Sequence, residues 1–196
     1  MINGINSREM ILEILLEIEE GEHSHVAIRN ALSKYQFLPK QDRAFITRVC
    51  EGTLEYRIQI DYIINSFSKV TVDKMKPAIR EILRSAVYQL KYMDSVPDSA
   101  VCNEAVKLAQ RKGFYNLKPF VNGVLRTIAR EMDQVRFPQK EDDLLKYLSV
   151  KYSMPEVLVT RWLEAYGEET TEKILADFLT EHPLTIRCRT YLNSKE

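Results

Sequence analysis

The chain lacks the features that mark several large classes of protein. It has three cysteines among 196 residues, far apart in the sequence and without a CxxC pair. Cysteines spaced in this way form no disulfide framework, and with the missing signal peptide they indicate a reduced, cytoplasmic protein. No apolar run approaches the roughly 18 residues that suggest a membrane span, so we expect no membrane partner.

Motifs for catalysis and for cofactor binding are equally scarce. The sequence contains no P-loop, no GxGxxG and no grouping of Ser, His and Asp, and none of its cysteines lies in a catalytic motif. The segment His23-Ser24-His25 offers two metal ligands but no third or fourth, and its place at a predicted helix start favours capping. We therefore expect no catalytic residue, no metal and no cofactor in this chain.

Strand-like alternation is almost absent, and helical periodicity takes its place. From Pro77, apolar residues recur at helical spacing and predict a buried stripe: Ile79, Ile82, Leu83, Ala86, Val87 and Leu90. Arg80, Arg84 and Lys91 fall outside this stripe and are expected to lie in water. A second helix should run from about 100 to 112 and pack against the first, which makes both the centre of an all-helical domain.

Similar patterns predict helices on either side of this pair. They occur at about 6–20, 24–35, 40–67 and 117–134, which gives six or seven helices and an all-α bundle over residues 1–135. Glycine is rare, and Gly52 within the long pattern at 40–67 costs about 1 kcal/mol relative to alanine, which predicts a close helix contact or a bend.

A helical connector is expected over residues 136–182, after the boundary at Phe137-Pro138. Within it, Ser153-Met154-Pro155-Glu156 has the pattern of a capping box at a helix start. Leu184, Ile186 and Cys188 then alternate with polar residues and predict one strand in residues 183–196. A lone strand has no partner for its backbone groups, so we expect the chain to stop just inside a following α+β domain. The alternative is a tail that alternates by chance.

Charge is balanced overall, so net charge gives no argument for a polyanionic partner. The distribution differs: between residues 105 and 130 the chain carries six basic residues and no acidic one, whereas residues 137–196 carry 8 basic and 11 acidic residues. The basic set could bind RNA phosphates and consists of Lys107, Arg111, Lys112, Lys118, Arg126 and Arg130. Phe114 and Tyr115 lie between them and could stack on bases. The alternative is a solvated helix face with two core aromatics.

Three further arginines could extend this surface, namely Arg8, Arg43 and Arg48. Asn103 and Glu104 also suggest an acid and an amide in a site, but a structural role, bonding backbone near the loop at 94–97, is the better interpretation.

Several short segments carry a family resemblance. They are Cys50-Glu51-Gly52-Thr53-Leu54, Leu83-Arg84, Val87-Tyr88-Gln89-Leu90, Val96-Pro97, Asn103-Glu104-Ala105-Val106 and Phe120-Val121-Asn122-Gly123-Val124-Leu125-Arg126. In this order, over about residues 5–135, they resemble the NusB-like RNA-binding domain. Four later segments are similar to the RsmB (Sun/Fmu) family of 16S rRNA cytosine-C5 methyltransferases: Tyr152-Ser153-Met154-Pro155, Arg161-Trp162, Tyr166-Gly167-Glu168 and Pro183-Leu184-Thr185-Ile186-Arg187.

The resemblance implies a function that this chain would share with the rest of a longer protein. In that family the NusB-like domain comes first, followed by a helical connector, a small RRM-like subdomain and a Rossmann-type domain that binds S-adenosylmethionine. The resemblance thus implies that residues 183–196 hold the first strand of a truncated RRM-like subdomain. The cysteines and glycine-rich loop of the catalytic core have no counterpart here. The chain is then expected to recognise 16S rRNA and to partner its own C-terminal methyltransferase domain. Two alternatives remain open: a free-standing NusB-like antitermination factor that works with a ribosomal protein, and a helical protein-interaction module without RNA.

Overall fold

The computed structural model describes residues 6–180, and all regular structure in this range is helical. The α-helices are α1 Ser7–Glu19, α2 Ser24–Lys34, α3 Lys40–Glu55, α4 Arg57–Phe67, α5 Pro77–Tyr92, α6 Asp98–Arg111, α7 Lys118–Glu131, α8 Leu144–Lys151 and α9 Glu156–Phe178. Short 3-10 helices are η1 Val72–Lys74, η2 Tyr115–Leu117 and η3 Met132–Gln134. The predicted all-α class is confirmed for the described residues, and the predicted strand at 183–196 lies outside them.

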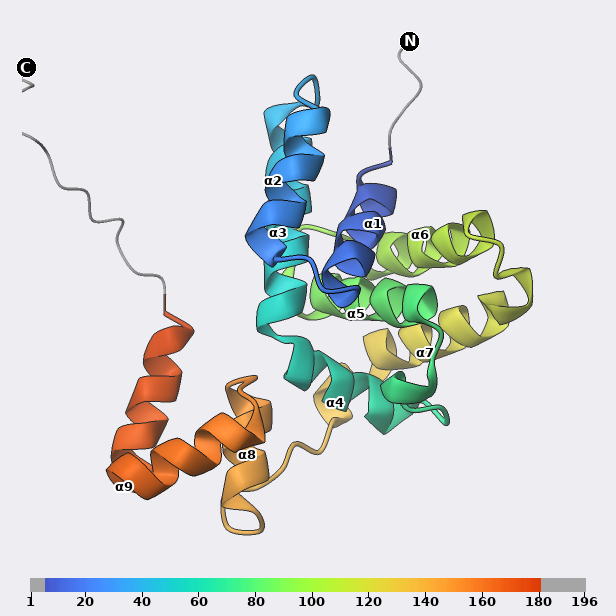
Figure 1. Cartoon of the computed structure of the whole chain (residues 1–196). Coiled ribbons are helices and arrows are strands. Elements are labelled where there is room, and N and C mark those ends of the chain that lie inside the picture. Colours follow the sequence, from blue (N-terminus) through green and yellow to red (C-terminus); the bar gives the residue numbers. More distant parts are fainter. Residues whose placement is uncertain (1–5, 181–196) are drawn as a thin grey trace, which may run out of the picture.

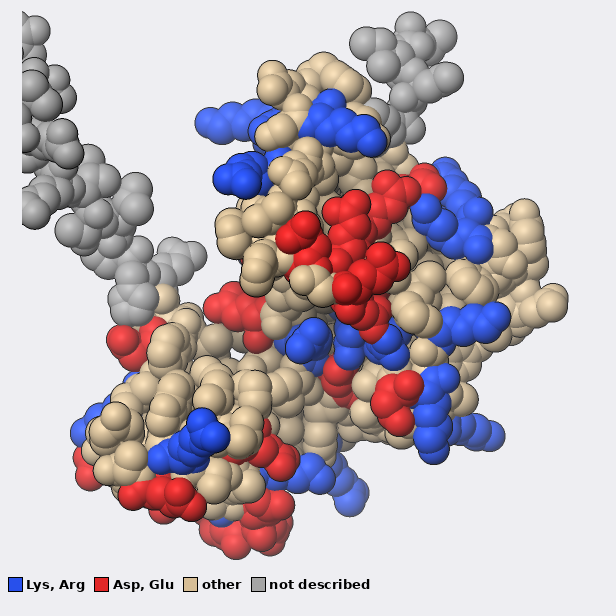
Figure 2. Space-filling view, in the orientation of Figure 1, with Lys and Arg blue, Asp and Glu red and all other residues tan. Residues whose placement is uncertain are grey.

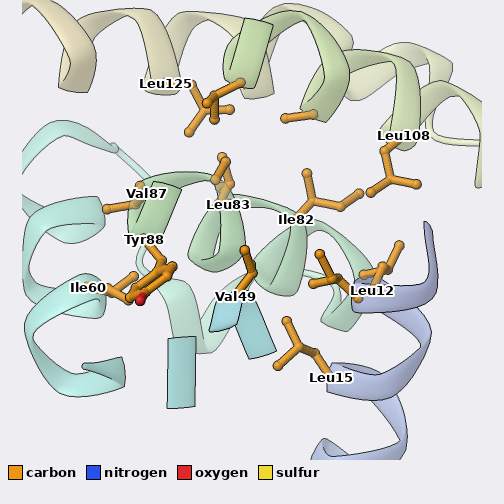
Figure 3. Close-up of a cluster of buried hydrophobic side chains, with 14 of the residues drawn as sticks. Leu12, Leu15, Val49, Ile60, Ile82, Leu83, Val87, Tyr88, Leu108 and Leu125 are labelled. Carbon is orange, nitrogen blue, oxygen red and sulfur yellow. The ribbon is translucent and has the colours of Figure 1, made fainter. Parts of the chain in front are cut away.

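Helix α5 forms the centre of the bundle made by α1 to α7 (Figure 1). It packs against five other helices, α1, α3, α4, α6 and α7. Its stripe residues Ile82, Leu83 and Val87 meet side chains from all five, which include Leu12, Leu15, Val49, Ile60, Leu108 and Leu125 (Figure 3). Because each fully buried leucine or isoleucine contributes about 1.5–3 kcal/mol, this shared core holds the bundle together.

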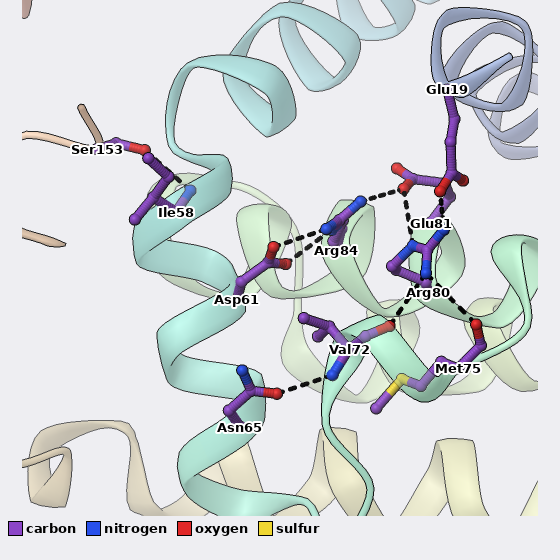
Figure 4. A network of polar contacts seen from close by, with 10 residues as sticks. All are labelled: Glu19, Ile58, Asp61, Asn65, Val72, Met75, Arg80, Glu81, Arg84 and Ser153. Atoms are coloured by element: carbon purple, nitrogen blue, oxygen red, sulfur yellow. Dashed lines mark hydrogen bonds and ion pairs between the residues drawn. The ribbon is translucent and has the colours of Figure 1, made fainter. Parts of the chain in front are cut away.

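The expectation that Arg84 lies in water is wrong. Its guanidinium is buried, and it donates two hydrogen bonds to the Asp61 carboxylate at 2.7 and 2.6 Å and one to Glu81 at 2.5 Å (Figure 4). Burial raises the pKa of the Glu81 carboxyl, against the opposing influence of Arg84. Since helix α5 is surrounded on every side, a charge opposite its apolar stripe also becomes buried and requires a partner.

Arg80 and Lys91 are also less exposed than the periodicity predicts. Arg80 pairs with Glu19 and donates to the carbonyl oxygens of Val72 and Met75 at 3.1 and 3.4 Å, which ties α1 and η1 to α5 (Figure 4). The Lys91 ammonium lies 5.4 Å from the centre of the Phe137 ring. Both side chains therefore connect elements of the fold.

The long pattern at 40–67 forms two helices, which meet at Tyr56. This break is the bend that Gly52 predicts, and the predicted close helix contact is present as well. Gly52 packs directly under the ring of Tyr88, where a Cβ atom would overlap the ring. Apolar residues keep the same spacing on both sides of Tyr56, so the pattern alone does not reveal the break.

Helix α8 lies beside α4 at the edge of the bundle, and α9 packs against α8 to form a second, small core (Figure 1). Leu148, Val159 and Leu175 are fully buried there, and the Trp162 ring stacks on Phe178. Gly167 has φ +74° and produces a kink in the middle of α9.

The capping-box pattern predicts that Ser153 caps α9, and this prediction is wrong. Pro155 precedes the helix without a side-chain cap, and the Ser153 hydroxyl instead accepts a hydrogen bond from the backbone N–H of Ile58 at 3.1 Å (Figure 4). Ile58 is the second residue of α4, whose first N–H groups have no partner within the helix. Ser153 thus supplies the missing cap across 95 residues of sequence.

Candidate nucleic-acid interface

The predicted basic segment forms a helical hairpin of α6, η2 and α7. Gly113 ends α6 with φ +86°, a conformation that favours glycine, and Pro119 stands in the first turn of α7. Leu108 of α6 and Val121 and Leu125 of α7 are buried in the core of the bundle. The apolar sides of both helices therefore face inward and leave their cations at the surface.

Two of the six cations lie on the side of α6 that faces α1. The Lys112 ammonium is 3.0 Å from a Glu13 oxygen and 3.5 Å from a Glu9 oxygen, and Arg111 lies 3.9 Å from Glu9. Burial opposes the charge of Lys112, but the Glu13 and Glu9 carboxylates outweigh it and raise the pKa of its ammonium. Figure 2 shows a red patch over α1, the helix that carries Glu9 and Glu13, with blue side chains over α6 beside it. The charges on this side largely neutralise one another.

Two further cations pair with acids on their own helix. Lys107 contacts Glu104 at 2.7 Å, and this hydrogen bond is the main cause of the lowered pKa of the Glu104 carboxyl. Arg130 contacts Glu131 at 2.6 Å. The side chains of Lys107 and Arg130 are 61% and 69% exposed. Exposed pairs of this kind contribute about 0–1 kcal/mol, so a phosphate can compete for either cation.

Lys118 and Arg126 make no ion pair within residues 6–180. Arg126 is exposed, and its guanidinium donates to the side-chain oxygens of Asn122 at 3.0 Å and Asn103 at 3.2 Å. These bonds hold it over the seam between α6 and α7. They also correct the interpretation of Asn103 and Glu104, since neither bonds backbone of the loop at 94–97; their partners are Arg126 and Lys107.

The two aromatic residues of the hairpin turn differ in exposure. Tyr115 is 60% exposed, whereas Phe114 is half-buried against the core. The ammonium of Lys76, just before α5, lies 5.3 Å from the centre of the Phe114 ring. Lys76 therefore joins Lys118 and Tyr115 at this end of the hairpin. Lys76 lies outside the basic stretch at 105–130, so the charge pattern of the sequence does not assign it to this surface.

The three additional arginines hold helices together. Arg43 donates to the carbonyl oxygen of Leu32 at 2.7 Å, and Arg48 donates to that of Tyr92 at 3.3 Å. The Arg8 guanidinium lies 5.3 Å from the centre of the Phe45 ring, where burial lowers its pKa against the raising influence of Glu104. Arg48 is exposed, and Arg8 and Arg43 are half-buried.

Neither the histidines nor the buried cysteines form a reactive site in the described part of the chain. No group of three or more His, Cys, Asp or Glu side chains is placed to hold a metal between residues 6 and 180. The rings of His23 and His25 stack on each other at the surface. Burial raises the pKa of both Cys50 and Cys102, which disfavours the thiolate that nucleophilic chemistry requires. Over the same residues, no helix has the length and apolar character needed to cross a membrane.

Comparison with known proteins identifies the family of this helical bundle. The family model described as "NusB family" matches residues 5–130, well over half of the chain. The chain belongs to the NusB family. A transcription antitermination protein NusB from Dictyoglomus thermophilum is 33% identical over 130 residues, which cover 66% of the chain and 85% of that protein.

A second relative extends beyond the NusB match. The "Probable ribosomal RNA small subunit methyltransferase B" of Bacillus subtilis (strain 168) is 34% identical over 180 residues. The match includes 92% of this NusB-family chain but 40% of the relative, so the chain spans less than half of that protein's length.

Solved structures show the same fold. A crystal structure of PH0851 has a TM-score of 0.70 at 21% identity, and the match covers 91% of this chain and 40% of PH0851. NusB from a complex of the antitermination factors NusB and NusE with double-stranded RNA has a TM-score of 0.58 at 21% identity over 63% of this chain and 93% of that one. At these identities the likeness shows the fold alone.

Proposed function

We propose that this chain is an RNA-recognising region, and that its RNA surface is the α6–η2–α7 hairpin. The observation that carries the proposal is the combination, on a NusB-family bundle, of cations without ion pairs and an exposed aromatic ring. Lys118, Arg126 and Lys76 can neutralise phosphates, and Tyr115 offers a flat face to an unpaired base. Lys107 and Arg130 can join them by exchanging weak pairs for phosphates.

The RNA we propose is ribosomal. The methyltransferase relative matches α8 and α9 as well as the bundle, whereas the NusB relative matches 66% of the chain. This difference favours a region of an RsmB-type enzyme over the alternative, a free-standing antitermination factor. We propose that the whole protein transfers a methyl group from S-adenosylmethionine to cytosine C5 of 16S rRNA, and that the present residues recognise the RNA.

The RNA surface is tested by a pair of double variants with equal loss of charge. Lys118→Gln with Arg126→Gln removes two cations without ion pairs, and Arg111→Gln with Lys112→Gln removes two that are paired with glutamates of α1. Binding to a single-stranded 16S rRNA fragment is measured by fluorescence anisotropy between 50 and 200 mM salt, a range suggested by the strong salt dependence of such complexes.

We expect the first variant to flatten the slope of log affinity against log salt by about 1.4, since each phosphate contact contributes about 0.7 for single strands. The second variant should change the slope by less than half of that. Thermal melts of both variants establish that they are folded. Equal slopes for the wild type and the first variant would place the RNA surface elsewhere, and absence of binding by the wild type would reject RNA recognition altogether.

A further inference from the structure

Helices α2 and α3 meet at one end of the bundle (Figure 1), and the cations there form no ion pair within residues 6–180. We name this end the α2–α3 tip and define it as residues 29–40. Between residues 23 and 41 the sequence contains Arg29, Lys34 and Lys40 and no Asp or Glu. None of these three makes an ion pair within the described chain, and all three are exposed. In Figure 2 this end shows blue side chains with no red among them.

This pattern differs from that of the α6–α7 hairpin. There, four of the six predicted cations lie within 4 Å of a glutamate oxygen. The acidic residues that flank the tip in sequence are Glu22 and Asp42, and Glu22 hydrogen-bonds the backbone N–H of His23. A cation without an acidic partner breaks no ion pair when it binds an external anion. The Lys34 ammonium lies 5.6 Å from the centre of the Tyr35 ring, and the three cations have no carboxylate to release.

An exposed aromatic residue lies between Lys34 and Lys40 in the sequence of the tip. Phe37 is 59% exposed and takes no part in either hydrophobic core of the described residues. The rings of Phe37 and Tyr35 pack edge to face, with their centres 6.0 Å apart. This contact covers at most one face of the Phe37 ring and leaves the other open. A large apolar ring in water has an unfavourable hydration free energy, which a stacked base would relieve.

The turn that presents Phe37 is held by the neighbouring helix. The Arg43 guanidinium donates to the carbonyl oxygen of Leu32 at 2.7 Å and to that of Tyr35 at 3.5 Å, at the end of α2. The backbone N–H of Leu38 donates to Tyr35 O at 3.1 Å. A ring on a fixed turn loses little conformational entropy on binding, which favours stacking.

From these contacts we propose that the α2–α3 tip is a second RNA-binding site. It takes a short unpaired stretch of RNA, with one base stacked on Phe37 and the adjoining phosphates bound by Arg29, Lys34 and Lys40. This proposal rests on the proposed RNA function and adds a site on a different part of the bundle. Unpaired RNA suits the tip better than an anionic lipid surface, because one ring offers little apolar area for membrane insertion.

Two variants separate the two parts of this site. Arg29→Gln, Lys34→Gln and Lys40→Gln together remove the cations, and Phe37→Ala removes the ring. The matched control is Arg136→Gln with Lys146→Gln and Arg161→Gln. It also loses three exposed positive charges, one before α8, one in α8 and one in α9. The probe is a 12-nucleotide single-stranded RNA, and affinity is measured over the same range of salt for all four proteins.

The two tip variants should behave differently. The triple tip variant should flatten the salt slope by about 2, which corresponds to three phosphates on single-stranded RNA. Phe37→Ala should weaken binding about tenfold and leave the slope unchanged, since stacking releases no counterions. The control should keep the wild-type slope, and thermal melts establish that each variant is folded.

The outcomes distinguish this site from the proposed function. If the wild type binds RNA and both tip variants bind like the control, the tip site is rejected and the hairpin surface stands. If the wild type binds no RNA, the proposed function fails as well. Binding of phosphatidylserine vesicles that is lost in the tip variants, while their RNA affinity is unchanged, would assign the tip to membranes and overturn the proposal.

Discussion

Gly52 and Tyr88 show how one small residue fixes the packing of two helices. A methyl group at position 52 would overlap the Tyr88 ring, which is 6% exposed and packs against the rings of Tyr56 and Tyr92, themselves stacked on each other. The ring cannot retreat without moving its aromatic neighbours. Gly52 therefore favours close approach of α3 to α5 at the cost of helix propensity.

We expect Gly52→Ala to destabilise the protein by about 1–2 kcal/mol, measured by urea denaturation. Overpacking of this kind costs about 1–3 kcal/mol, and the better helix propensity of alanine returns up to about 1 kcal/mol. In a Tyr88→Ala background the overlap is gone, so the same substitution should stabilise by up to about 1 kcal/mol. Stabilisation by Gly52→Ala in the otherwise wild-type protein would contradict this account.

The buried Arg84 marks a limit of reasoning from single residues. Periodicity assigns it to the solvent side of α5, and no local signal names Asp61, 23 residues earlier, as its partner. The same limit applies to the candidate RNA surface. The sequence identifies its cations except Lys76, but it gives no sign that Lys112 pairs with Glu13, 99 residues away. Charge partners between helices depend on how the helices pack, so which cations stay free emerges only after folding.

At the scale of elements, helical periodicity predicts most of the fold. Strong apolar stripes locate the helices. Gly21 and Gly113 adopt positive φ just after α1 and α6, and Gly167 does so at the kink in α9, because glycine adopts positive φ more readily than other residues. The division of residues 40–67 into α3 and α4 was not predictable in this way. That break depends on tertiary contacts, among them the cap that Ser153 provides.

Ser153 gives a direct test of how α8 and α9 are joined to α4. We expect Ser153→Ala to destabilise by about 1 kcal/mol, as loss of a helix cap usually does, and to accelerate amide exchange at Ile58. Ser153→Asn is the control, because asparagine also caps helices and tolerates the φ of +52° at this position. The two measurements are amide exchange, monitored by NMR, and urea denaturation. If Ser153→Ala matched the wild type in both, this link between the helices would be contradicted.

At the scale of the whole molecule, charge is sorted among the parts of the chain. Cations without partners lie at the α6–η2–α7 hairpin and at the α2–α3 tip, while acids gather over α1 (Figure 2). Residues 137–180 carry five basic and nine acidic residues, and Glu172 there binds Lys140 and Lys151. Hydrogen bonds from these two lysines lower the pKa of the Glu172 carboxyl to about 2. We therefore expect RNA to contact the bundle and to avoid α8 and α9.

The most direct test of this central claim is photo-crosslinking of the chain to a 16S rRNA fragment that contains 4-thiouridine, with the crosslinked peptides identified by mass spectrometry. The account predicts crosslinks in the segment from Phe114 to Arg130, with Tyr115 prominent because its ring is exposed. Crosslinks confined to α8 and α9, or to the acidic surface of α1, would contradict it.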